Sequence, residues 1–133
     1  MTNNKKDGTK FEKEIAEMFH TYKFWVHLLA EKTTGRQPAD IIASKNGKTV
    51  LIECKTVKDR FNFSRIEDNQ RTGFNHFIRC GNKEAFFCFK FNGEIGFISF
   101  LKIFNMFADG KTSMNFEEFC KNKISFFQFV KRF

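Results

Sequence analysis

The spacing of apolar residues along the chain predicts an alternation of helices and strands. Phe11, Ile15 and Phe19 recur at helical intervals, and Thr9 with Glu12 three positions later matches the capping box of a helix N-terminus. Further along, short apolar runs of strand length lie between Gly, Asn and Pro breakers. The predicted elements are helix 9–22, strands 24–30, 39–45 and 48–57, helix 64–79, strands 85–91 and 94–99, helix 100–108 and a helix from Asn115. Ser64 with Glu67, and Asn115 with Glu118, are predicted to cap two of these helices.

The element order α-β-β-β-α-β-β-α predicts a mixed α/β fold in which helices flank one β-sheet. With 133 residues in all, residues 9–133 are expected to form a single domain with its own core. Residues 1–8 are polar and basic, and we expect a flexible tail there. The four cysteines show no CxxC spacing and are expected to be reduced thiols. Because the sequence has neither a signal-peptide pattern nor a long apolar run, a cytoplasmic protein is expected.

The two apolar runs at 39–45 and 48–57 are separated by Asn46-Gly47, the strongest short-range signal for a tight β-hairpin. If these two residues form the turn, Lys45 lies opposite Lys48, and continuing along the ladder places Asp40 opposite Glu53. Directly opposed residues share a face, with Cβ atoms about 5 Å apart. The side chain two positions after Glu53 points to that face as well, so Lys55 is expected beside the two carboxylates.

Two opposed carboxylates destabilise a sheet unless a positive charge compensates them, and a divalent metal ion is a natural candidate. Asp40 and Glu53 supply the hard oxygen ligands that Mg²⁺ prefers, and the backbone carbonyl of Cys54 is a candidate third ligand. The Cys54 thiol points to the opposite face of the strand. Phosphodiester hydrolysis needs such a metal together with a cation such as Lys55. The alternative is an ordinary cross-strand salt-bridge cluster.

The chain carries a formal net charge of +8 with a pI near 9.5, which indicates a polyanionic partner such as nucleic acid. Basic residues near the proposed site suit salt-sensitive phosphate contacts, although such residues are often only solvated surface. Peripheral membrane binding fits less well because the chain has no basic amphipathic helix. The candidate DNA-binding residues are Arg36, Lys45, Lys48, Lys58, Arg60, Arg65 and Arg71.

Pro38-Ala39-Asp40 with Glu53-Cys54-Lys55 resembles the signature of PD-(D/E)xK nucleases. Gly8 to Glu12 before the first helix is similar to the opening of RecU-type and archaeal-type Holliday junction resolvases, and Arg36-Gln37-Pro38 resembles the RecU type more closely. The resemblance covers roughly residues 8–120. It implies a restriction-endonuclease-like fold with a mixed β-sheet flanked by helices.

By this resemblance Asp40 and Glu53 are metal ligands and Lys55 is the catalytic lysine. Glu12 would complete the acidic cluster from the first helix, and Gln70 would support the site from the second. Both have alternatives, because Glu12 also fits the capping box and Gln70 also fits a solvated helix position. The implied cofactor is Mg²⁺, with Mn²⁺ able to substitute.

The implied activity is a structure-selective endonuclease that resolves four-way DNA junctions in recombination and repair. A restriction-type or repair nuclease acting on duplex or flap DNA, and a non-catalytic DNA-binding module, are the alternatives. Two symmetric cuts in a junction require two related sites, so we expect a homodimer. The Phe-rich end of the chain (Phe126, Phe127, Phe129 and Phe133) supplies either that interface or core packing. The Phe-, Lys-, Asn- and Ile-rich composition suggests a bacterial or phage genome, and hence a bacterial or phage-infected host cytoplasm.

Overall fold

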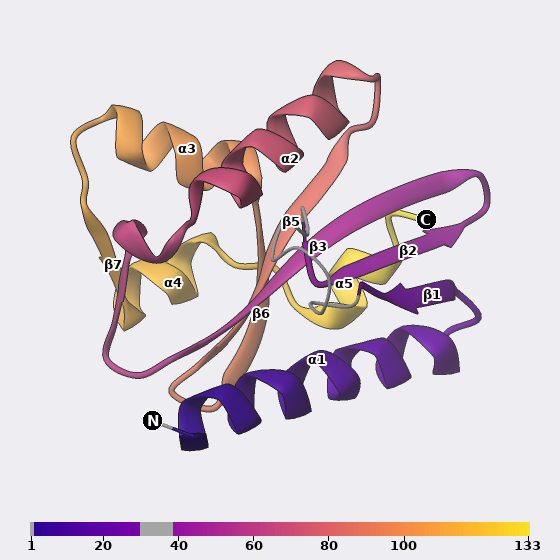
Figure 1. Ribbon diagram of the computed structural model, residues 1–133, viewed down its shortest axis with the longest axis horizontal. Helices are drawn as coiled ribbons and strands as arrows, with labels where there is room; N and C mark the ends of the chain where they lie inside the picture. Colours follow the sequence, from indigo (N-terminus) through magenta and orange to yellow (C-terminus); the bar gives the residue numbers. More distant parts are fainter. Residues whose placement is uncertain (1, 30–38) are drawn as a thin grey trace.

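The computed structural model of the protein describes residues 2–29 and 39–133, with side chains described from residue 8 onward (Figure 1). The helices are α1 (Thr2–Thr21), α2 (Asp68–Arg79), α3 (Phe100–Ala108), α4 (Phe116–Asn122) and α5 (Phe126–Val130). The strands are β1 (Trp25–Leu28), β2 (Ile41–Lys45), β3 (Lys48–Val57), β4 (Arg60–Asn62), β5 (Glu84–Phe91), β6 (Glu94–Ser99) and β7 (Ser113–Asn115), with a short 3-10 helix at Phe63–Arg65.

In the described part of the chain, one mixed sheet has the strand order β1-β2-β3-β5-β6. Strand β3 runs parallel to β5, and the other neighbouring pairs are antiparallel. The two hairpin turns, Asn46-Gly47 and Asn92-Gly93, have positive φ at both residues. This is the conformation of a two-residue turn whose twist matches the flanking strands. The predicted mixed α/β fold with a sheet flanked by helices is confirmed.

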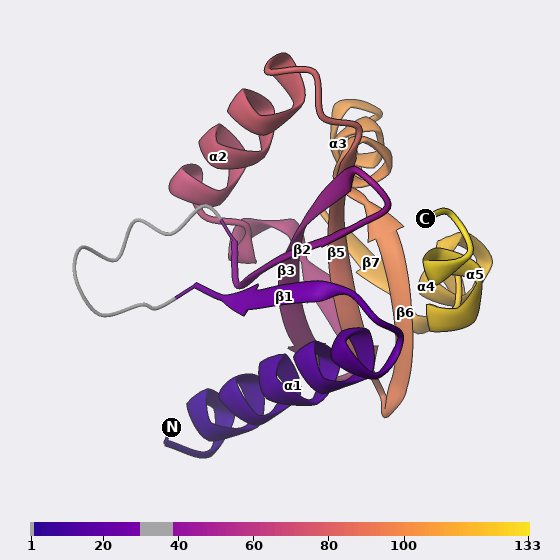
Figure 2. The same ribbon diagram turned by 90° about the vertical axis from the view of Figure 1, so that its right-hand side faces the viewer.

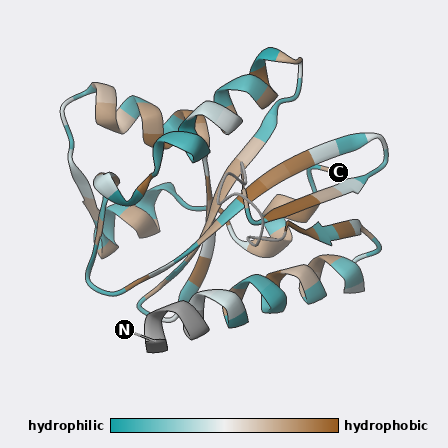
Figure 3. Ribbon diagram, viewed as in Figure 1, coloured by the Kyte–Doolittle hydropathy of each residue, from teal (hydrophilic) through white to brown (hydrophobic). Residues whose placement is uncertain are grey.

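The central sheet is covered by helices on both faces. We call the two sides the α1 face, where α1 and α5 pack, and the α2 face, where α2, α3 and α4 pack (Figure 2). Alternate residues of β3 point to the two cores: Val50, Ile52 and Cys54 to the first, Leu51 and Val57 to the second. Figure 3 shows hydrophobic residues in β3 and a mixture of hydrophilic and hydrophobic residues along α1 and α2.

Phenylalanine rings fill much of both cores. On the α1 face, Phe97 stacks on Phe129 with ring centroids 4.4 Å apart, and on the α2 face Phe74 meets Phe100 edge to face at 4.9 Å. Pairs of this kind contribute about 0.5–1.5 kcal/mol beyond the burial of their area. At the C-terminus, Phe126 and Phe129 are buried, whereas Phe127 is 60% exposed. Of the two predicted roles for these residues, dimer interface or core packing, Phe126 and Phe129 have the second.

The first helix begins earlier than the sequence pattern predicts. Helix α1 starts at Thr2, so it includes residues that were expected to form a tail, and Thr9 lies inside it. Polar residues and a single Gly8 continue a helix at little cost, since a glycine costs only about 1 kcal/mol relative to alanine. The predicted capping box of Thr9 with Glu12 is therefore wrong.

The second helix begins later than predicted. Its N-cap is Glu67, which forms a capping box with Gln70, and the predicted box of Ser64 with Glu67 is wrong. Ser64 belongs to the short 3-10 helix, because buried Phe63 and Ile66 anchor that turn to the core. The small sheet of β4 and β7 was also not predicted, since each is only three residues long. The predicted cap of Asn115 with Glu118 is confirmed.

All four cysteines are free, with Cys54 and Cys88 buried and Cys80 and Cys120 exposed. Burial and a hydrogen bond with Cys88 raise the pKa of the Cys54 thiol well above its usual value, so this thiol stays protonated in the core. Within residues 2–29 and 39–133, no helix has the length and apolar character needed to cross a membrane.

Gly96 in β6 tests the packing of α4 on the sheet. A Cβ at this position would lie 2.8 Å from Phe119 Cζ, a fully buried ring atom, and 2.8 Å from Lys123 Cβ. We expect Gly96→Ala to lower the free energy of unfolding by about 1–3 kcal/mol, measured by urea denaturation. Gly8→Ala is the control: its Cβ meets nothing within 4 Å and it lies in a helix, so stability should rise slightly. Equal effects of the two substitutions would contradict this packing.

Candidate active site

The hairpin of β2 and β3 sets Asp40 beside the middle of β3. The pairs Ile41↔Ile52 through Lys45↔Lys48 follow the predicted register. Asp40 lies just before β2, and its N–H donates to the Ile52 carbonyl at 3.0 Å. Two consecutive residues, Asp40 and Ile41, thus lie opposite the single residue Ile52, which is the arrangement of a β-bulge. The prediction that Asp40 lies directly opposite Glu53 is therefore wrong. Instead the Oδ2 atom of Asp40 accepts a hydrogen bond from the Cys54 N–H at 2.8 Å.

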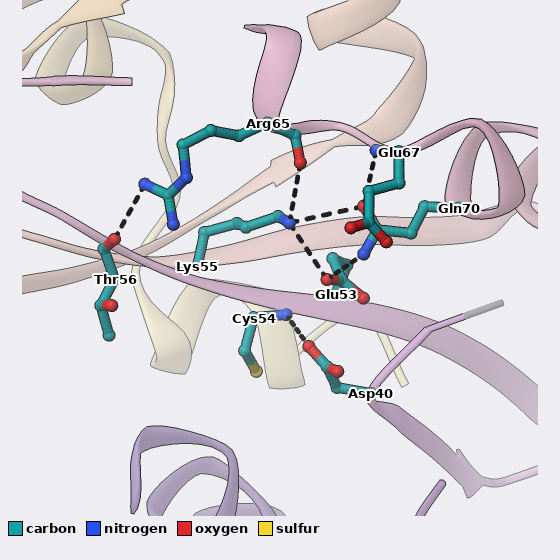
Figure 4. A network of polar contacts seen from close by, with 8 residues as sticks. All are labelled: Asp40, Glu53, Cys54, Lys55, Thr56, Arg65, Glu67 and Gln70. Carbon is teal, nitrogen blue, oxygen red and sulfur yellow. Dashed lines mark hydrogen bonds and ion pairs between the residues drawn. The ribbon is translucent and has the colours of Figure 1, made fainter. Parts of the chain in front are cut away.

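Glu53 and Lys55 point together to the α2 face, as the strand alternation predicts (Figure 4). The Lys55 ammonium lies 3.3 Å from Glu53 Oε2 and also donates to the Arg65 carbonyl at 3.2 Å and to Gln70 Oε1 at 3.4 Å. Glu53 is only 4% exposed. These contacts hold the ammonium in one position against a buried carboxylate.

Gln70 links Glu53 and Lys55 to the start of α2. Its Nε2 atom donates to Glu53 Oε2 at 2.6 Å, and its Oε1 atom accepts from the Glu67 N–H at 3.2 Å as well as from Lys55. The side chain is buried, so the alternative of a solvated helix residue is wrong. The capping box at the α2 N-terminus fixes the amide, because only one of its two orientations satisfies all three contacts.

Burial and the neighbouring Asp40 carboxylate raise the pKa of Glu53 to about 9, and Lys55 opposes this shift only in part. Ionisation of both carboxylates is therefore costly without a further positive charge. A divalent cation bound to these hard oxygen donors supplies that charge, so the donor set fits Mg²⁺. In the described part of the chain no three His, Cys, Asp or Glu side chains form a metal-binding group. A site of this kind relies on water and phosphate oxygens for its remaining ligands.

Glu12 lies within α1, half-buried, and the helix cap that was its alternative explanation is not formed. Together with Asp40 and Glu53 it does not make a metal-binding group among the residues that the structure describes. Its place in the acidic cluster stays a prediction.

The predicted DNA contacts that the structure describes divide into three groups. Lys45 and Lys48 flank the hairpin turn, at the opposite end of β3 from Lys55, and donate to the carbonyls of Tyr22 and Arg132 at 2.7 and 2.8 Å. In this structure they tie the hairpin to the rest of the chain. Arg36 lies outside the described residues.

Lys58 and Arg65 line an open groove of about 1070 Å³, which on β3 is lined by Thr56 and Val57, directly after Lys55. Arg65 joins the two regions, since its carbonyl accepts from Lys55 and its guanidinium donates to the Thr56 carbonyl at 3.1 Å. Lys10 of α1 and Lys90 of β5 line the same groove, and the sequence analysis did not identify Lys90 as a DNA contact. They lie far apart in the sequence, so no local pattern signals their proximity.

The two remaining predicted contacts lie on other elements. Arg60 is on β4 and its guanidinium donates to Ser113 Oγ at 2.8 Å, across the small sheet. Arg71 is on α2, with its guanidinium 5.8 Å from the Phe107 ring centroid. Neither residue lines the groove, whose walls are α1, the end of β3 and the turn between β5 and β6.

Comparison with known proteins adds three findings. Residues 3–132 match the family model described as archaeal Holliday junction resolvase (Hjc). The chain is 26% identical, over 99% of its length and 92% of the relative's, to the protein named crossover junction endodeoxyribonuclease Hjc from Methanocaldococcus jannaschii. Its fold is similar to the solved structure of the Holliday junction resolvase Hjc from Archaeoglobus fulgidus, with a TM-score of 0.68 at 13% identity, covering 92% of this chain and 98% of that one.

The pKa of Glu53 predicts how the stability of the metal-free protein depends on pH. Below about pH 4.5 the carboxyl is protonated in both the folded and the unfolded chain, and up to about pH 9 only the folded chain keeps the proton. The free energy of unfolding should therefore fall as pH rises through this window. Glu53→Gln removes the titration and should raise stability at about pH 8 by roughly 2–5 kcal/mol, measured by denaturant unfolding with chelator.

Glu117→Gln is the control, because this glutamate is 81% exposed on α4. We expect its pH profile to follow that of the unmodified protein. A Glu53→Gln variant that loses stability with rising pH as steeply as the unmodified protein would contradict the assignment.

Proposed function

Because the chain belongs to the archaeal Holliday junction resolvase family, we propose that it is a metal-dependent endonuclease that cuts four-way DNA junctions through Asp40, Glu53 and Lys55. The convergence of these three side chains carries the proposal, since Lys55 lies 3.3 Å from Glu53 and Asp40 is bonded to the residue between them. The matched family model is that of the archaeal-type resolvases, one of the two types that the sequence resembles.

In the proposed site, the carboxylates of Asp40 and Glu53 and the Cys54 carbonyl would hold Mg²⁺, and Mn²⁺ would substitute. The ion, when bound, supplies the Lewis-acid charge that phosphodiester hydrolysis requires. Lys55, held by contacts to Glu53 and Gln70, places an ammonium where negative charge develops on the phosphate. We assign Gln70 a positioning role, because it touches both charged groups. Glu12 is proposed as the third carboxylate, contributed from α1.

The groove beyond Lys55 is proposed to hold the backbone of the cleaved DNA strand. It is lined by Lys10, Lys58, Arg65 and Lys90, and its acidic residues are Glu14 and Asp59. An excess of cations over carboxylates suits phosphate contacts, which position DNA without reading its bases. Arg60 and Arg71 would contact more distant arms of a junction, and Arg36, Lys45 and Lys48 remain proposed contacts outside the groove.

The proposed activity is tested with a synthetic four-way junction and a linear duplex of equal length, each with Mg²⁺ and with chelator. We expect paired symmetric nicks near the crossover of the junction, no comparable cutting of the duplex, and no cutting with chelator. Equal cutting of both substrates would favour a restriction-type or repair nuclease. Binding without cleavage under any metal condition would favour a non-catalytic DNA-binding module.

Asp40→Asn separates the metal site from the DNA-binding surface. Removing one anionic ligand should lower junction cleavage at least 100-fold, while junction affinity in a gel-shift assay with chelator should change less than about threefold. The control is Asp68→Asn at the start of α2, an exposed carboxylate with no part in the proposed site, which should cut normally. Normal cleavage by Asp40→Asn in Mg²⁺ would refute the site assignment.

We propose that the protein acts as a homodimer, because two symmetric cuts need two related sites. The exposed face of α3 is our candidate for the interface. Leu101, Phe104 and Phe107 are 52%, 40% and 51% exposed there, beside an apolar pocket of about 200 Å³ lined by Phe63 and Ile66 among others. Contiguous apolar surface of this kind marks interaction sites. The C-terminal alternative is weaker, since Phe126 and Phe129 of α5 are buried in the core and only Phe127 of that helix is exposed to solvent.

Phe107→Ser tests the proposed interface. We expect it to shift the molar mass measured by light scattering from dimer to monomer, or to weaken dimerisation at least tenfold, without changing the far-UV circular dichroism. Phe127→Ser is the matched control, an exposed phenylalanine on α5 that should leave the dimer intact. A dimer unaffected by Phe107→Ser but broken by Phe127→Ser would place the interface at the C-terminus.

A resolvase must meet chromosomal or replicating DNA, so we propose a cytoplasmic location. The relatives named above come from archaea. They give no support to the bacterial or phage origin suggested by composition.

A further inference from the structure

The edge strand β1 presents an exposed aromatic pair on one face. Trp25 and His27 stack with ring centroids 6.3 Å apart and an interplanar angle of 12°, and Trp25 is 62% exposed. Val26 and Leu28, which alternate with them, pack into the core on the α1 face. Core packing therefore accounts for Val26 and Leu28 but not for Trp25 and His27. An exposed tryptophan presents aromatic surface that a planar ligand can cover.

The register of the sheet shows that this pair shares a face with the proposed catalytic residues. His27 pairs with Ile42, and Ile42 pairs with Leu51 of β3. Directly opposed residues share a face, and Glu53 lies two positions after Leu51, so all of these side chains point to the α2 face.

On the α2 face, helices α2 and α3 pack against β5 and β6. The β1 side of the same face carries the exposed rings of Trp25 and His27. The strand also leads directly to the metal site, because the Leu29 N–H donates to the Asp40 carbonyl at 2.9 Å. The aromatic pair and Glu53 thus lie on the same face of the sheet, and β1 is hydrogen-bonded to the residue that carries the second carboxylate.

We propose that Trp25 and His27 form a stacking platform for an unstacked nucleobase near the scissile phosphate. The inference rests on the proposed nuclease function and adds a binding site to it. Bases at the crossover of a branched DNA are more easily unstacked than those within a duplex, and every base offers a π-face to an aromatic ring. A positively charged chain with exposed stacked rings beside a phosphate-cleaving site fits that ligand.

The spacing of the sheet suits this arrangement. Strands lie about 4.8 Å apart and rise about 3.3 Å per residue, which places His27 roughly 12 Å and Trp25 roughly 16 Å from Glu53 along the sheet. A stacked DNA strand advances about 3.4 Å per nucleotide, so these distances correspond to about three to five nucleotides. A base at that separation from the cleaved bond reaches the rings without crossing the groove on the other side of Lys55.

The chain contains a single tryptophan, so emission excited at a wavelength that Tyr22 does not absorb reports on Trp25 alone. The protein is titrated, with chelator present to prevent cleavage, with an intact four-way junction and with the same junction carrying abasic nucleotides at the crossover. We expect the intact junction to quench the emission and the abasic junction to quench it at most half as much. A junction that binds in a gel-shift assay and leaves the emission unchanged would refute the platform.

Substitutions of Trp25 test the stacking platform through their effect on the affinity for the junction. Trp25→Ala should weaken binding of the intact junction about 5- to 100-fold, whereas Trp25→Phe, which keeps a stacking ring, should stay within about threefold of the unmodified protein. Phe127→Ala is the control, since it removes a ring of similar exposure from α5. For the abasic junction, Trp25→Ala should have little further effect. A Trp25→Ala protein with unchanged circular dichroism and unchanged affinity for both junctions would refute the platform.

The two proposals fail in different ways. If the unmodified protein neither binds nor cuts junctions in preference to duplexes, the proposed function is refuted and the platform with it. If it cuts junctions symmetrically while the fluorescence and affinity results contradict stacking, only the platform is refuted.

Discussion

The register of β2 on β3 determines how Asp40, Glu53 and Lys55 lie relative to one another. Asn46 and Gly47 adopt the positive φ values that a tight two-residue turn requires, and the five pairs from Lys45↔Lys48 to Ile41↔Ile52 follow from that turn. A slip of one residue would move Glu53 and Lys55 to the α1 face, among the apolar residues packed on α1. The hydrophobic alternation of β3 prevents such a slip, since it would also place Ile52 and Cys54 on the wrong side.

The same strand holds a local conflict that suits its proposed role. Glu53 is buried beside Asp40, and burial with that neighbouring charge raises its pKa to about 9. Such an arrangement lowers the stability of the folded chain at neutral pH, and a salt bridge with Lys55 offsets it only in part. Functional sites often retain unfavourable electrostatics of this kind, because the charge that relieves them is supplied by a ligand.

The α2 face has two distinct halves, separated by β3. On the β5 side, α2 contributes Gln70 and the short 3-10 helix contributes the Arg65 carbonyl, so the Lys55 ammonium and Glu53 Oε2 are both held by hydrogen bonds. On the β1 side, the exposed surface is aromatic, with Trp25 stacked on His27. One half thus orients the charged residues, and the other offers rings to a ligand. A strand of DNA passing across β3 would meet both.

The sequence alone predicted the mixed α/β order, the Asn46-Gly47 hairpin, and the association of Asp40, Glu53 and Lys55, because these follow from local patterns of period two and from turn chemistry. Tertiary structure decided what local patterns do not contain. The bulge that turns Asp40 toward the Cys54 N–H, and the burial of Gln70 against Glu53, depend on how β2 and α2 pack on β3. The groove residues Lys10 and Lys90 come together only because α1 crosses the sheet near the end of β5, a proximity between distant segments that no local signal encodes.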